Sequence, residues 1–201
     1  TLRRVGDTPV VGLAYHVPAV THPDAIPVQV LGSILSTQPS GRLYKALVEP
    51  KKVVSVFASS QGMHDPGTFE VAASLPKGGN VDEVRDTILA LVESVKEKGV
   101  TQEEVDRAKR AILKNRELGS ADTNQIGVRL SEAIAEGDWR LYFLQRDRIE
   151  AVTPAQVKEV ASKYLARSNR TVGVFLPTTA PERTPVPPTP DIATLVDHYK
   201  G

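Results

Sequence analysis

The most restrictive feature of this sequence is a run of helical patterns, from Asn80 to Leu165, that lies between β-prone segments. It begins with the capping pattern Asn80-x-x-Glu83, after which apolar residues recur every three or four positions. Gly99 ends this helix where a left-handed C-terminal cap is favoured. Further helices are predicted at about 101–118, 123–136, 139–149 and 153–165. Thr101 with Glu104 opens the first of these, and Thr153 with Gln156 caps the last. The residues expected to face the core are Val81, Val84, Ile88, Leu91, Val92, Val95, Val105, Ala108, Ile112, Leu118, Val157, Val160, Ala161 and Leu165.

The flanking segments predict strands and two shorter helices. Residues 2–5 and 10–17 are β-prone and read as a pair of strands joined by a turn at Gly6-Asp7. Helical spacing follows at 24–36 and 41–48, then a β-hairpin at 53–58 and 69–75, and a closing strand at 171–176. Helices kept apart from a mostly antiparallel sheet predict an α+β fold, with the helices packed on one face.

The two parts of the chain differ in composition. Residues 1–176 carry the periodic patterns and are predicted to form one domain, whereas residues 177–190 are rich in proline and poor in apolar side chains. Such a segment favours extended polyproline geometry and could span on the order of 40 Å. Ala193, Leu195 and Val196 then form a short amphipathic piece. We therefore predict that residues 177–201 are an interdomain linker with a short docking helix.

Composition excludes several classes of function. The formal net charge is +1 and the charges are interspersed, so neither a nucleic-acid partner nor a membrane surface is expected. Hydrophobic content of 40% is typical of a soluble globular domain. The absence of cysteine removes disulfides, thiolate nucleophiles and sulfur-ligated zinc. The chain starts without Met in a strand pattern, which suggests a processed segment; we expect a periplasmic or exported bacterial protein, with the cytoplasm as the alternative.

No catalytic motif is present in the sequence. The four histidines, His16, His22, His64 and His198, include no pair at the helical spacing of a zinc site, although a site built from distant members stays open. His22 is interpreted as a local helix cap, and His64 with Asp65 as part of a hairpin turn. Trp139, Tyr142 and Phe143 are interpreted as core anchors rather than as a binding patch.

An ordered set of motifs resembles a known family. The motifs are His22-Pro23-Asp24, then Val30-Leu31-x-x-Ile34-Leu35, then Ser40-Gly41-Arg42-Leu43-Tyr44-x-x-Leu47-Val48-Glu49, with the hairpin and capped helices following in order. They resemble the start of the second, non-metal domain of pitrilysin/insulinase-type (inverzincin) zinc metallopeptidases, and the resemblance covers about residues 2–177. It implies that zinc is bound by an upstream domain through an H-x-x-E-H motif. It also implies that this domain forms the opposite wall of a chamber for peptide substrate.

The sequence departs from the family pattern at the positions that contact substrate. The second domain of such enzymes often supplies an Arg and a Tyr seven residues apart, and the matching positions here are Val48 and Ser55. Neither residue can replace an Arg fork or a Tyr hydroxyl. Arg42 and Tyr44 are weak substitutes, because a spacing of two on a helix points them apart.

These observations predict a non-catalytic domain of a zinc metallopeptidase. The segment itself is expected to bind no cofactor and to be inactive alone, while the full-length protein carries zinc and further downstream domains. One alternative is a non-enzymatic scaffold or assembly subunit on the same fold. A third hypothesis, an independent hydrolase that uses His64 and Asp65, is disfavoured by the turn reading of that pair.

Overall fold

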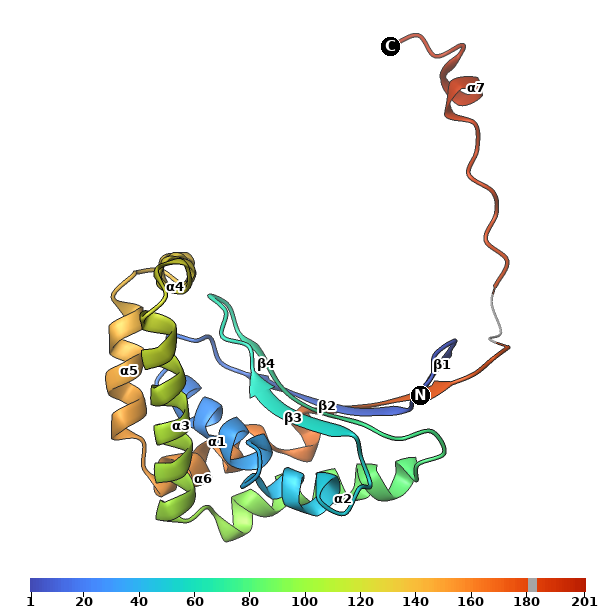
Figure 1. The fold of residues 1–201 in the computed structure, drawn as a ribbon. Coiled ribbons are helices and arrows are strands. Elements are labelled where there is room, and N and C mark those ends of the chain that lie inside the picture. Colours follow the sequence, from blue (N-terminus) through green and yellow to red (C-terminus); the bar gives the residue numbers. More distant parts are fainter. Residues whose placement is uncertain (181–183) are drawn as a thin grey trace.

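Helices cover one face of a five-stranded β-sheet and leave most of the other face bare (Figure 1). The computed structural model describes residues 1–180 and 184–201. The strands are β1 (Leu2–Arg4), β2 (Val10–Val17), β3 (Ser55–Ser60), β4 (Gly67–Ser74) and β5 (Arg170–Pro177). The helices are α1 (Ala25–Ser36), the π-helical turn η1 (Tyr44–Val48), α2 (Val81–Lys98), α3 (Gln102–Ser120), α4 (Thr123–Ala135), α5 (Leu141–Ala151), α6 (Pro154–Tyr164), the 3₁₀ turn η2 (Arg167–Asn169) and α7 (Ile192–Val196). The α+β prediction is confirmed.

The strand order is β1-β5-β2-β4-β3, and all neighbours are antiparallel except β1 and β5. The predicted β3–β4 hairpin is confirmed. The predicted pairing of the first two strands is wrong, because β5 lies between them and pairs with both. A connection of five residues spans roughly 16 Å when extended, which is enough to pass over one strand at about 4.8 Å spacing. The sheet is therefore mixed rather than wholly antiparallel.

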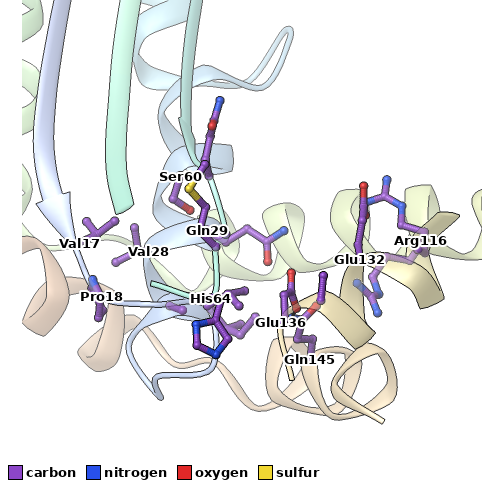
Figure 2. A pocket seen from close by; sticks show the side chains of 18 residues that line it. Val17, Pro18, Val28, Gln29, Ser60, His64, Arg116, Glu132, Glu136 and Gln145 are labelled. Carbon is purple, nitrogen blue, oxygen red and sulfur yellow. Dashed lines mark hydrogen bonds and ion pairs between the residues drawn. The ribbon is translucent and has the colours of Figure 1, made fainter. Parts of the chain in front are cut away.

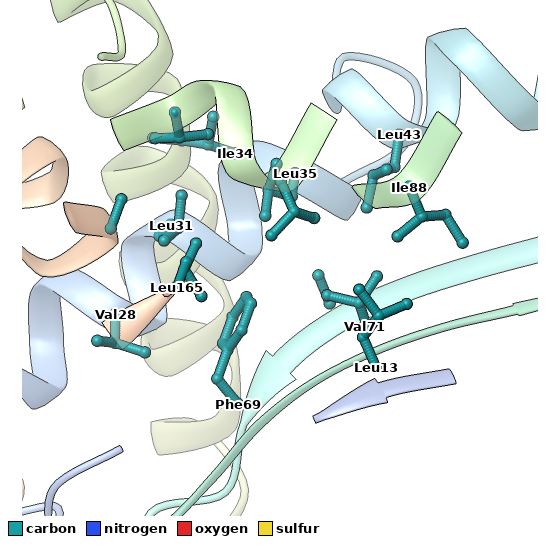
Figure 3. Packing of buried hydrophobic residues seen from close by; sticks show 14 of the residues in the cluster. Leu13, Val28, Leu31, Ile34, Leu35, Leu43, Phe69, Val71, Ile88 and Leu165 are labelled. Atoms are coloured by element: carbon teal, nitrogen blue, oxygen red, sulfur yellow. The ribbon is translucent and has the colours of Figure 1, made fainter. Parts of the chain in front are cut away.

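Buried and exposed side chains alternate along the strands, so one face of the sheet forms part of the core. Val11, Leu13, Tyr15 and Val17 of β2 are buried, whereas the residues between them are partly or fully exposed. The buried face of the sheet packs mainly on α1 and α2 (Figure 3). Phe69 of β4 points between the helices, toward Leu31 and Leu165 (Figure 3). A second helical layer, α3 and α5, packs on α1 from outside.

The N-caps of all three predicted capping boxes form, but only two of the boxes do. Thr101 and Thr153 each exchange both hydrogen bonds with the residue three positions on. Asn80 caps α2 by accepting from the backbone N–H of Glu83 at 3.1 Å. The carboxylate of Glu83 instead pairs with Lys52 at 2.6 Å, so the reciprocal half of this box is absent. The cap residue predicts the helix start, whereas Lys52, from the loop between η1 and β3, takes the carboxylate of Glu83 away from the box.

Near α4 and α5, two predictions about buried residues are wrong. Trp139 and Phe143 are 52% and 40% exposed, so they are not core anchors. Their rings pack edge to face at 5.9 Å, because this end of α5 lies beyond the sheet and has no core to enter. Leu118 of α3 is 62% exposed and does not face the core as predicted.

The chain ends in an arm that extends away from the sheet (Figure 1). The predicted linker begins where β5 ends, at Pro177, but residues 181–183 of that linker lie outside the described residues. The predicted amphipathic piece is α7, and none of its residues is buried. No helix among the described residues combines the length and hydrophobicity needed to cross a membrane.

Candidate functional site

Val48 and Ser55, the positions of the degenerate Arg/Tyr pair, lie on neighbouring elements. Val48 ends η1 and packs half-buried against the core, while Ser55 opens the edge strand β3 and is exposed. A hydrogen bond from Val53 N–H to Leu47 C=O, at 3.1 Å, holds together the two ends of the loop that connects these elements. The loss of Arg and Tyr at these two positions as substrate contacts stays a prediction from the sequence.

Arg42 is already engaged within the domain. Its Nε and Nη2 donate to the two carboxylate oxygens of Glu104, each at 2.7 Å, and Nη2 also donates to Gly99 C=O at 3.0 Å. These hydrogen bonds lower the pKa of Glu104 to about 2, and the bond from Arg42 contributes most. The fork thereby fastens the η1 segment to the start of α3. Tyr44 is half-buried two positions further along the chain.

The four histidines are dispersed over the molecule. His16 is exposed on β2, His64 and Asp65 lie 3.3 Å apart in the exposed hairpin loop, and His198 is in the C-terminal arm. His22 accepts a hydrogen bond from the backbone N–H of Asp24 at 3.0 Å, just before α1, but no side chain caps the N-terminus of α1 itself. Within residues 1–180 and 184–201, no three His, Asp or Glu side chains come together as a potential metal site.

A cleft of about 640 Å³ lies where the β3–β4 hairpin loop approaches the helices (Figure 2). Its apolar lining comes from the end of β2, the segment after it, and the start of α1, and includes Val17, Pro18, Ile26 and Val28. Its polar lining comes from α1, the hairpin and α3 to α5, and consists of Gln29, Gln61, His64, Arg116, Arg129, Glu132, Glu136 and Gln145. Apolar walls with a few convergent polar groups are typical of a binding site.

Two ionisable groups of this cleft are partly withdrawn from water. Burial lowers the pKa of Arg116, whose guanidinium lies 4.4 Å from the ring centre of Tyr142 and donates to the Tyr142 carbonyl. Burial raises the pKa of Glu136, against the hydrogen bond that it accepts from Gln145 at 3.1 Å. Among the described residues, Arg116 forms no ion pair with a carboxylate. A partly dehydrated cation, a partly dehydrated acid and amide side chains can form hydrogen bonds with the polar groups of a ligand.

The sequence prediction missed this cleft, although one signal was present. Val105, Ala108 and Ile112 mark the inward stripe of α3, and the next position on that stripe is Arg116. A charged residue on the buried side of an amphipathic helix indicates a polar site. Leu118, which was expected to continue the stripe, lies off it and is exposed.

The α+β domain matches a peptidase family. Residues 2–112 match the model of the Peptidase M16 inactive domain. That match takes in more than half of the chain, so the protein belongs to this family, as the sequence motifs implied. The prediction of a non-catalytic domain is thereby confirmed.

Solved and curated relatives agree with this assignment. The inactive peptidase domain of a proposed zinc protease from Bordetella parapertussis is 42% identical, with a TM-score of 0.80, over 92% of this chain and 99% of that one. A proposed zinc protease from Bordetella pertussis Tohama I is also 42% identical, with a TM-score of 0.78, over 86% and 96% of the two chains. The zinc protease PqqE of Helicobacter pylori is 30% identical over 100 residues, which are 49% of this chain. The match covers only 22% of the Helicobacter protein.

Proposed function

We propose that this domain is the non-catalytic partner of a zinc-bearing domain in a larger peptidase that cleaves peptides or unfolded proteins. The observation that carries this proposal is the 42% identity to an inactive peptidase domain over nearly the whole chain. Residues 1–176 would form the wall of the chamber opposite the metal, and residues 177–201 would lead to downstream domains. The zinc would be held by an upstream H-x-x-E-H motif, where it would activate water for peptide hydrolysis.

The cleft at the hairpin is the surface through which this domain would contact substrate. Its amide and charged side chains can pair with peptide groups, and its apolar walls can bury a side chain. The edge strand β3 runs directly into the same hairpin, so an extended peptide could add to that edge. The residues that would hold the peptide are Arg116, Glu136 and Gln145.

A periplasmic location is part of the same proposal. A protein of the same fold, the periplasmic protease PqqL of Escherichia coli, is 14% identical with a TM-score of 0.69. Fractionation of cells that express the full-length protein would test this point.

The test uses the full-length protein and a quenched-fluorescence peptide substrate. We expect cleavage that is abolished by a chelator and restored by zinc, with none from the 201-residue chain alone. Arg116→Ala should raise KM about tenfold with kcat nearly unchanged, which corresponds to about 1.4 kcal/mol of binding. Arg110→Ala, on the exposed side of the same helix, is the matched control.

Different failures would overturn different parts. A full-length protein that cleaves nothing in the presence of zinc would favour the scaffold alternative. Chelator-sensitive cleavage with an unchanged KM in a stably folded Arg116→Ala variant would remove the cleft from substrate binding, while the peptidase assignment would stand.

A further inference from the structure

The bare face of the sheet carries a hollow that the domain does not use. It has a volume of about 280 Å³ and lies on the adjacent strands β2, β4 and β5. The residues that line it from the bare face are Gly12, Ala14, Glu70, Ala72, Thr171 and Gly173, with Leu13 and Val71, whose side chains are buried in the core, between them. Gly12 pairs directly with Gly173 on one side and with Ala72 on the other. The exposed face of an antiparallel sheet is ordinarily polar, whereas Glu70 and Thr171 are the two polar residues of this lining and the others are glycine or apolar.

The glycine at position 12 is not required by the fold. A Cβ built there would meet no atom within 4 Å, and at Gly173 it would meet only the Gly12 carbonyl oxygen at 4.0 Å. Neither residue has the positive φ that favours glycine. Glycine inside a strand weakens it, and it commonly marks a place where another backbone approaches closely. The hollow therefore indicates a packing partner that is not in place in this conformation.

The C-terminal arm carries a matching apolar stripe. Ile192, Leu195 and Val196 occupy positions i, i+3 and i+4 of α7, and Tyr199 follows the turn after it. Their side chains are between 55% and 79% exposed. Such spacing is the pattern by which a helix docks into an apolar groove. A helix of five residues is too short to be stable alone in water, so α7 needs a surface on which to pack.

The dimensions of the arm favour docking on its own domain. The arm leaves on the helix-free side of the sheet, and the chain bends at Thr179 and Ala180 directly after β5 (Figure 1). The stiff, proline-rich residues 185–190 span about 19 Å in polyproline geometry. The hollow lies four to six residues back along β5 from Pro177, which is about 13–20 Å. A short tether also gives an effective concentration in the millimolar range, above that of any second copy in dilute solution.

We propose that α7 and the turn after it fold back and pack Ile192, Leu195, Val196 and Tyr199 against the hollow around Gly12 and Gly173 of the same chain. The small side chains of β2, β4 and β5 let the helix backbone approach the sheet closely. The arm then covers the bare face of the sheet. While α7 is bound there, neighbouring domains could not pack on that face. This surface is separate from the cleft, and the inference does not depend on the proposed peptidase function.

The test exploits the absence of cysteine from the chain. A nitroxide is attached to His198→Cys in the ¹⁵N-labelled 201-residue protein, and amide signals are followed at low protein concentration. We expect the signals of Gly12, Ala72 and Gly173 to broaden, with those of α3 unaffected. A nitroxide at Glu117→Cys, on α3, is the control that should leave the bare face unaffected.

Two variants make the result specific. Gly12→Leu fills the hollow and should abolish the broadening, whereas Gly12→Ala should retain most of it; thermal unfolding verifies that both are folded. Leu195→Ser with Val196→Ser should also abolish it. Absence of broadening in the parent protein would overturn the proposal. A second sample mixes a nitroxide-labelled chain at natural nitrogen abundance with a ¹⁵N-labelled chain that carries no nitroxide. Broadening that appears only in this mixture would overturn the proposal in favour of docking between two copies.

Discussion

At the scale of single residues, the ion pair between Arg42 and Glu104 joins two motifs that the sequence presents separately. Arg42 belongs to the motif that suggested a substrate contact, and Glu104 to a helix cap. Glu104 accepts from Arg42 with both oxygens and from the backbone N–H of Thr101 at 2.8 Å. Helical spacing predicted the two helical segments that carry these residues. It could not predict their contact, because they are 62 positions apart in the sequence and meet only in the folded structure.

The protonation of Glu104 should therefore govern part of the stability. Its pKa is lowered to about 2, so it contributes stability above the ordinary glutamate pKa of about 4.3 and loses it as the pH falls toward 2. We expect Glu104→Gln to lower the free energy of unfolding by about 2 kcal/mol at neutral pH and by less near pH 3. Urea unfolding at both pH values measures this.

The adjacent residue supplies the control for this prediction. Glu103 is 80% exposed and pairs with Arg107 at 3.1 Å, so Glu103→Gln should change stability by less than about 0.5 kcal/mol at either pH. Equal effects of the two substitutions, or a Glu104→Gln effect that does not change with pH, would contradict the role assigned to the buried pair.

At the scale of elements, helix starts were predicted better than side-chain partners. Asn80, Thr101 and Thr153 were each expected to open a capping box, and each does cap its helix. Whether the capping box is completed depends on what else lies near the Glu or Gln three positions after the cap. At α2, Lys52 pairs with the carboxylate of Glu83 instead. Likewise, the existence of the first strand was predictable, but its partner β5 begins some 170 residues later in the chain.

This difference between helix starts can be measured. Gln156→Ala removes the acceptor for the Thr153 N–H, at 2.9 Å, and should destabilise the protein by about 1 kcal/mol. Glu83→Ala removes only a half-exposed ion pair with Lys52, and should cost less than about 0.5 kcal/mol. Thermal unfolding of the two variants is the comparison. A loss from Glu83→Ala as large as that from Gln156→Ala would mean that the α2 box forms in solution.

At the scale of the whole molecule, the sequence predicted the α+β architecture and the family, but not the cleft. Order along the chain carries the architecture, because a run of helices from α2 to α6 is kept apart from the strands before and after it. The cleft combines α1, the hairpin loop and three later helices, so its residues have no common spacing. Only Arg116, on the inward stripe of α3, gave a local indication of it.

The last prediction concerns metal binding by the chain as a whole. Zinc needs three or four ligands about 2 Å away, and the four histidines occupy a strand, a helix start, a hairpin loop and the arm. His22 Nδ1 already accepts a hydrogen bond from the backbone N–H of Asp24, and within residues 1–180 and 184–201 no three His, Asp or Glu side chains lie together. Elemental analysis of the purified 201-residue chain, after dialysis against zinc, should therefore give far less than one equivalent, while the full-length protein should retain about one per chain. One equivalent held by the short chain alone would show that histidines which this fold keeps apart can meet, and would contradict the assignment of the metal to an upstream domain.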